Sequence, residues 1–244
     1  MMIYRLPLMQ DGNKNINLFF PRSHCILCSK AIGPKNLIPI FSFLLQKGKC
    51  DACKEPISLM YPLNELLHLL VGLLLYFLFG LNAQLFFAYF VFFSFFILFI
   101  LDYKYFLLPF WLNLGMVLVG FVSIGVYETF TIPTFGFNQL NISFAGLFVG
   151  FFTLWLINTL FKAIKGIDGI GGGDFILLSS IGSLVGIFAL PFVLLLGSIS
   201  ALMIYFSKGR GIGNEIPLGS GFVIGFLLYC FFQYFELLQN YMVY

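Results

Sequence analysis

The feature that most constrains this chain is a run of 36 residues, from Leu66 to Leu101, without a single Asp, Glu, Lys or Arg. As one helix it would measure about 54 Å, whereas the hydrocarbon core of a bilayer is about 30 Å thick. The run therefore predicts two membrane spans, with the hairpin between them at Gly80-Leu-Asn-Ala83. Charged residues make up 9% of the chain, against about 25% in soluble domains, so we expect lipid to surround most of it.

The number of spans depends on a second uncharged run, of 33 residues from Phe175 to Ser207. It fits either one overlong tilted helix or two short helices broken around Pro191. The positive-inside rule favours two, because seven spans place every Lys and Arg on one side, whereas six would place Lys208 and Arg210 on the other. We expect spans near residues 63–79, 84–101, 109–126, 142–161, 175–189, 191–206 and 217–235.

The N-terminal part is more polar, since 12 of the 23 charged residues lie within the first 65 positions. We therefore expect an all-α, polytopic integral membrane protein with about seven transmembrane helices and a small N-terminal head. Residues 1–61 form the head in this prediction, and residues 62–244 form the transmembrane domain. The basic side is the cytoplasmic side, so the head is expected in the cytoplasm. A net charge of +3, scattered along the chain, argues against nucleic acid as a partner.

Four of the five cysteines form two CxxC pairs, Cys25 with Cys28 and Cys50 with Cys53, with 21 residues between the pairs. Two such pairs offer the four thiolates of a tetrahedral zinc site, although the spacing lies just beyond the usual range. Structural zinc is the prediction, and redox pairs or unligated thiols are the alternatives. A four-thiolate site has no open position for water, so the metal would fold the head and perform no chemistry.

Two acids stand at the ends of predicted spans, where a carboxylate is costly unless it pairs or meets water. Asp102 closes the second span, and Asp174 follows the glycines Gly171 to Gly173 and opens the fifth. Taken alone, Asp102 could be an interfacial acid offset by Lys104, and Asp174 could be a helix N-cap. Seven spans, however, bring both acids to the same depth on the same side of the membrane.

Adjacent carboxylates cannot both ionise easily, so one keeps a proton while the other acts as a base. Such a pair can activate water and protonate a leaving amine, and the sequence leaves open which acid does which. Gly171 and Gly173 would let backbone or an extended substrate approach one of the acids closely.

Ordered motifs spread over nearly the whole chain carry a resemblance to a known family. They are Pro21-Arg-Ser-His-Cys25-Ile-Leu-Cys28, Asn36-Leu-Ile-Pro39, Lys47-Gly-Lys-Cys50-Asp-Ala-Cys53, Tyr61-Pro-Leu-Asn-Glu65, Asp102 with Leu108-Pro109, Gly171-Gly-Gly173-Asp174-Phe175 and Glu215-Ile-Pro217-Leu-Gly219. In this order they resemble the bacterial type IV prepilin peptidases, which are membrane aspartic proteases of the GxGD kind.

The resemblance implies an activity and a substrate. It identifies Asp102 and Asp174 as the catalytic pair and implies cleavage of the N-terminal leader of type IV prepilins or type II secretion pseudopilins. The cut would fall at the cytoplasmic face of the bacterial inner membrane. Because the cysteine-bearing head accompanies the bifunctional members, the resemblance also implies N-methylation of the new amino terminus with S-adenosylmethionine as methyl donor.

The sequence departs from the family at several places. The family usually has one further span before a Tyr-Arg-Leu-Pro string, which here begins at Tyr4, so a first span is expected to be missing or to lie upstream. Ile176 stands where a Lys is usual, and Lys104 and Phe110 stand where acids are usual. Ile176 and the missing span favour the alternative of a catalytically silent membrane assembly factor with the same fold. A protease of the signal-peptide-peptidase kind is a more distant alternative, because it gives no reason for the paired CxxC motifs.

Overall fold

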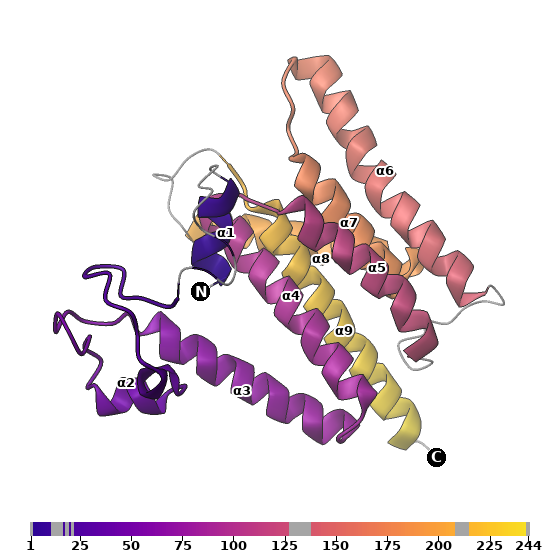
Figure 1. The fold of residues 1–244 in the computed structure, drawn as a ribbon. Coiled ribbons are helices and arrows are strands. Elements are labelled where there is room, and N and C mark those ends of the chain that lie inside the picture. Colours follow the sequence, from indigo (N-terminus) through magenta and orange to yellow (C-terminus); the bar gives the residue numbers. More distant parts are fainter. Residues whose placement is uncertain are drawn as a thin grey trace. The chain divides into compact units, whose positions relative to one another are not determined.

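Long apolar segments of the sequence form long helices in the computed structural model (Figure 1). The structure describes residues 2–10, 17, 20, 22–126, 138–207 and 215–242. Pro21, Lys208 and Arg210, on which sequence predictions rest, lie outside these residues. Within them, strand pairing is limited to two isolated bridges, which join His24 to Ala31 and Lys49 to Pro56. The predicted all-α fold class is confirmed.

Seven helices of the described ranges are apolar enough to be membrane segments. Four are also long enough to cross a bilayer: α3 (Met60–Phe79), α4 (Ala83–Tyr105), α6 (Gln139–Lys165) and the segment Ile187–Ser207, formed by η2 (Ile187–Ala189) and α8 (Leu190–Ser207). Three have shorter apolar stretches: α5 (Phe110–Val126), α7 (Gly172–Val185) and α9 (Leu218–Met242). The prediction of a polytopic membrane protein with about seven helices is confirmed.

The break within the second uncharged run lies at Gly186. There α7 ends in a glycine with φ 78°, a left-handed conformation that side chains disfavour, and the short η2 leads into α8. The run is therefore two helices, as predicted, but the break does not lie around Pro191. Pro191 sits in the first turn of α8, where its missing N–H leaves no helical hydrogen bond unmade.

The chain divides into two compact units, Met1–Phe93 and Ser94–Tyr244, with α4 continuing from the first into the second. Besides α3, the first unit contains α1 (Met2–Gln10), η1 (Pro34–Leu37) and α2 (Phe41–Leu45). None of the residues of α3 is buried, so its apolar surface is available to lipid. Asn82 forms the turn after α3 by donating to the Phe79 carbonyl and accepting from the Leu85 N–H.

The second unit is built around α7, which packs against α5 and α6, while α8 packs against α9 (Figure 1). Gly146 of α6 meets Gly182 of α7 so closely that a Cβ on either would overlap the other's backbone. Gly225 of α9 approaches the backbone of Gly197 of α8 in the same way. Small residues that allow such close approach are a main source of helix association in membranes. These contacts hold α7 and α9 against their neighbours, and the first turns of both helices contribute to the site described next.

Candidate active site

Asp102 and Asp174 meet across one glycine in the second unit. Asp102 lies near the C-terminal end of α4, and Asp174 is the third residue of α7. A Cβ placed on Gly219 would lie 3.1 Å from Cγ of Asp102 and 3.1 Å from Oδ1 of Asp174. These two carboxyl atoms are therefore no farther apart than twice that distance. The structure thus brings together the two acids that the sequence singles out.

The Asp102 carboxyl group lies against the first turn of α9. It is 5% exposed, and its Oδ2 accepts hydrogen bonds from the Ser220 backbone N–H at 2.5 Å and from the Ser220 hydroxyl at 2.7 Å. The first N–H groups of a helix have no partner within it and carry partial positive charge. The C-terminal end of α4 would not stabilise a carboxylate, but the first turn of α9 stabilises that of Asp102.

Asp174 has different surroundings. Its side chain is partly exposed, yet its Oδ1 is buried and has no hydrogen-bond partner among the described residues. The N-cap of α7 is Gly171, and no side chain caps this helix. Asp174 is therefore not an N-cap, so that alternative reading of its role is wrong.

The glycines before Asp174 differ in how tightly they are packed. A Cβ on Gly173 would lie 2.7 Å from Cβ of Leu108, and one on Gly171 would lie 3.3 Å from Oδ2 of Asp174. A Cβ on Gly172 would meet no atom within 4 Å. Gly171 and Gly173 are thus the two positions of the run at which a side chain would crowd the acid or the Leu108-Pro109 segment.

Asn158 of α6 anchors the loop that leads to Asp174. Its Oδ1 accepts from the N–H groups of Gly169 at 2.8 Å and Ile170 at 3.0 Å, and its Nδ2 donates to Asp168 at 3.0 Å. Lys162 donates to the other oxygen of Asp168 at 2.8 Å, and both partners keep the pKa of that carboxyl below its ordinary value. Asp168 is thereby engaged in holding the loop.

The sequence analysis missed Asn158 and Ser220. A signal existed for Asn158, because a buried amide in an apolar helix needs partners. Ser220 gave a weaker signal as a hydroxyl in the first turn of a helix. Its partner lies 118 positions away, so spacing could not have identified it.

The close approach at Gly219 predicts that Gly219→Ala disrupts the pair. The new methyl group would stand between the two carboxyl groups, so we expect any activity that needs both acids to fall about 100-fold or more. The measurement is the catalytic rate of the full-length protein in membranes. Gly172→Ala is the matched control, because a methyl group there meets open space. Equal rates for Gly219→Ala and the unchanged protein would contradict the geometry.

The four predicted cysteine ligands form one cluster in the first unit. The sulfur atoms of Cys25, Cys28, Cys50 and Cys53 all lie within 4.8 Å of one another, and those of Cys25 and Cys53 are 3.9 Å apart. Tetrahedral zinc with Zn–S bonds of about 2.3 Å would separate its sulfur ligands by about 3.8 Å. The cluster therefore has the size of a zinc site.

The two CxxC pairs have the same local geometry. In each pair the residue after the second cysteine has positive φ, 56° at Ser29 and 62° at Lys54, and donates its N–H to the carbonyl of the first cysteine. The backbone N–H groups of Cys53 and Ala52 lower the pKa of Cys50 to about 6. Those of Cys28 and Leu27 likewise lower the pKa of Cys25. The first cysteine of each pair is thus held in a turn that favours its thiolate, whereas burial and the neighbouring thiols raise the pKa of Cys53 to about 11.

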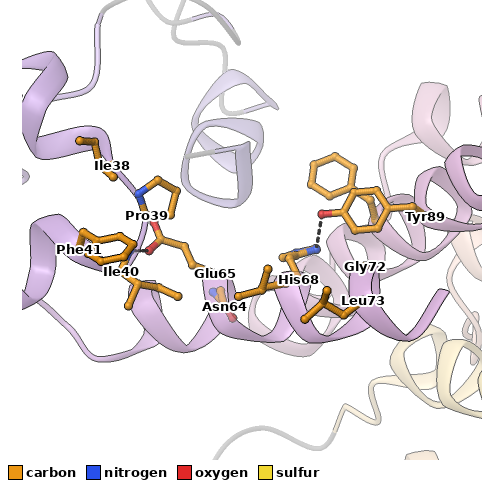
Figure 2. A pocket seen from close by; sticks show the side chains of 12 residues that line it. Ile38, Pro39, Ile40, Phe41, Asn64, Glu65, His68, Gly72, Leu73 and Tyr89 are labelled. Carbon is orange, nitrogen blue, oxygen red and sulfur yellow. Dashed lines mark hydrogen bonds between the residues drawn. The ribbon is translucent and has the colours of Figure 1, made fainter. Parts of the chain in front are cut away.

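The first unit also contains a cavity of about 800 Å³, open to its surroundings, between the segment around Ile40 and helices α3 and α4 (Figure 2). Glu65 of α3 reaches the segment by accepting the Ile40 N–H at 2.7 Å. His68 lies one turn further along α3, with its Nδ1 3.4 Å from the Tyr89 hydroxyl. The rings of Tyr89 and Phe93 contact the imidazole. A carboxylate and an imidazole thus border a largely aromatic and aliphatic cavity.

Comparisons with known proteins give a consistent result. Residues 1–79 match the family model of the bacterial peptidase A24 N-terminal domain, and residues 89–206 match that of the type IV leader peptidase family. The chain is 31% identical over 217 residues to a prepilin leader peptidase/N-methyltransferase of Pectobacterium carotovorum, covering 83% of this chain and 75% of the relative.

Two further relatives carry the same name. The protein of Neisseria gonorrhoeae is 32% identical over 209 residues, covering 84% of this chain and 70% of the relative. That of Vibrio cholerae is 30% identical over 233 residues, covering 94% of this chain and 89% of the relative. No solved structure matches the chain.

Proposed function

Because the chain belongs to the type IV leader peptidase family, we propose that it is a prepilin leader peptidase with Asp102 and Asp174 as its catalytic groups. Its substrates are the N-terminal leaders of type IV prepilins or type II secretion pseudopilins. The observation that carries the proposal is the meeting of two carboxyl groups, from two different helices, across Gly219. Ile176 and Lys104 depart from the family pattern, but both acids of the pair are present in the chain.

The chemistry is aspartic proteolysis. One carboxylate takes a proton from a water molecule, and the resulting hydroxide attacks the scissile carbonyl carbon. The other carboxyl group donates a hydrogen bond to the carbonyl oxygen and then gives its proton to the departing amine. The missing side chain of Gly171 leaves room beside Oδ2 of Asp174 for an extended segment of substrate, and that of Gly173 makes room for Leu108, which supports the loop.

Replacing either acid by its amide tests this function. We expect Asp102→Asn and Asp174→Asn each to lower leader cleavage about 1000-fold or more, because an amide can neither take nor supply the proton. The readout is a leader-sized mass loss from a prepilin co-expressed in membranes. Glu55→Gln is the control, since it makes the same acid-to-amide change at an exposed side chain of the head.

The outcomes of this test separate the rival functions. Normal cleavage by either amide variant would contradict the catalytic assignment. No cleavage by the unchanged protein would instead favour the catalytically silent assembly factor.

The proposed location is the bacterial inner membrane. Residues 1–61 form a cytoplasmic head, and residues 62–244 form the transmembrane peptidase domain. The distribution of basic residues supports this orientation, because eight of the 13 lie between Arg5 and Lys54.

The head holds one structural zinc ion. The four sulfur atoms have the separation that such a site needs, and the backbone lowers the pKa of the first thiol of each pair, Cys25 and Cys50, so the residues fit the metal. Zinc bound by four thiolates would tie the two CxxC turns together in a segment with few buried side chains, and it would leave no position for a reacting water.

The zinc proposal predicts one zinc ion per chain in the purified protein and four thiols that resist alkylation until a chelator is added. Cys50→Ser should lose the metal and make the head sensitive to protease, because three thiolates hold zinc less tightly. Cys230→Ser, a thiol in α9, should retain the metal. Metal-free protein with a protease-resistant head would rule the site out.

The second proposed activity is N-methylation of the amino terminus that cleavage creates. The names of the relatives support it. The cavity beside Glu65 fits a methyl donor of the S-adenosylmethionine type, because its volume lies within the usual range of small-molecule sites, about 300–1,000 Å³. Its aromatic rings suit an adenine ring and a sulfonium cation.

In this proposal the bound donor supplies an electrophilic methyl group, and the chain positions the acceptor. Glu65 holds the ammonium group of the new amino terminus and takes the proton that this group must lose before it can accept methyl. The Ile40 N–H fixes one oxygen of Glu65 and thereby orients the other.

Glu65→Gln should separate the two activities. The amide keeps an oxygen for the Ile40 N–H but cannot take a proton, so we expect unchanged cleavage and a methylated fraction at least about tenfold lower. Mass spectrometry of the mature amino terminus measures both activities. Glu55→Gln, an exposed acid of the head, is the control. Full methylation by Glu65→Gln would exclude Glu65 from the reaction.

A further inference from the structure

The two catalytic acids receive unequal hydrogen bonding. Asp102 Oδ2 accepts two donors from Ser220, at 2.5 and 2.7 Å, whereas Asp174 Oδ1 is buried with no hydrogen-bond partner in the described part of the chain. Hydrogen bonds to an ionised oxygen are roughly twice as strong as those between neutral groups. Two converging donors therefore favour the anionic form of Asp102.

The helix dipoles alone do not explain why the two acids differ in hydrogen bonding. Asp174 lies in the first turn of α7, and the Asp102 carboxyl group lies against the first turn of α9, so both face the positive end of a helix. The distinguishing groups are the backbone N–H and the hydroxyl of Ser220, and of these the hydroxyl is the one that a substitution can remove. Ser220 is fully buried, and it follows directly on Gly219, the residue between the acids.

The Ser220 hydroxyl can also exchange its hydrogen-bond partners when Asp102 gains or loses a proton. Its oxygen lies 3.1 Å from the carbonyl of Phe99, one turn earlier in α4. A hydroxyl both donates and accepts. It can donate to ionised Asp102, and once Asp102 is protonated it can accept from that carboxyl group while donating to the Phe99 carbonyl. The anion is thus stabilised without being locked in that state.

We propose that Ser220 is a positioning residue that makes Asp102 the base and leaves Asp174 as the acid. This inference rests on the proposed peptidase function. The proton from water passes to Asp102 as the new C–O bond forms. The proton on Asp174 passes to the amine nitrogen as the C–N bond breaks. Asp174 keeps that proton beforehand because a second charge beside ionised Asp102 is unfavourable.

Two substitutions at Ser220 separate hydrogen bonding from packing. Ser220→Ala removes the hydroxyl, and Ser220→Cys nearly keeps the side-chain volume but donates only weakly. We expect kcat for prepilin cleavage to fall about 100-fold in the first and nearly as far in the second, with KM unchanged in both. The assay uses the purified full-length protein in lipid, with the unfolding temperature measured for each variant.

Ser200→Ala is the matched control, because this buried hydroxyl in α8 bonds only to the Leu196 carbonyl among the contacts that the structure gives it. It should leave kcat unchanged. The proposal is overturned if Ser220→Ala cleaves at the rate of the unchanged protein, or if Ser220→Cys does so and shows that only volume matters. If the unchanged protein cleaves no prepilin, the peptidase function itself fails and this inference falls with it.

Discussion

The second unit depends on bringing two carboxyl groups together among apolar helices. A buried acid is costly, and two that face each other are more so. Asp102 is stabilised by Ser220 at the start of α9, and the segment before Asp174 is tied to α6 by Asn158. Each acid therefore depends on an element distant in sequence. A pair arranged in this way forms only when α4, α6, α7 and α9 have all assembled.

Glycine contacts explain how helices without a strong hydrophobic drive toward one another reach that arrangement. Close helix approaches, such as those of Gly146 with Gly182 and of Gly197 with Gly225, bring backbone against backbone. Gly219 continues this pattern into the site, where the missing side chain sets the spacing of the acids. The same property, the absence of a Cβ, thus serves packing in the helices and chemistry at their ends.

The sequence predicts the features that depend on local composition. Uncharged runs identify the apolar helices. The positive-inside rule sets the number of spans, and that number predicts that Asp102 and Asp174 lie at the same depth in the membrane. The break near Pro191 was misplaced because proline is tolerated in a first turn, whereas Gly186 adopts a left-handed φ that only the structure reveals. Ser220 and Asn158 escaped prediction because their importance lies in partners that the fold brings to them.

The two proposed reactions make different demands on their surroundings, which gives a physical reason for separate sites. Cleavage consumes a water molecule, so the acids must be reachable by one, and Asp174 is partly exposed. Methyl transfer from a sulfonium requires a neutral amine as nucleophile, and the aromatic and aliphatic lining beside Glu65 suits the sulfonium cation. A carboxylate serves both reactions, but in different states. Asp102 works as one of a pair that shares a proton, whereas Glu65 is oriented by a single backbone N–H. Each proposed reaction therefore relies on its own carboxylate, held by its own partners.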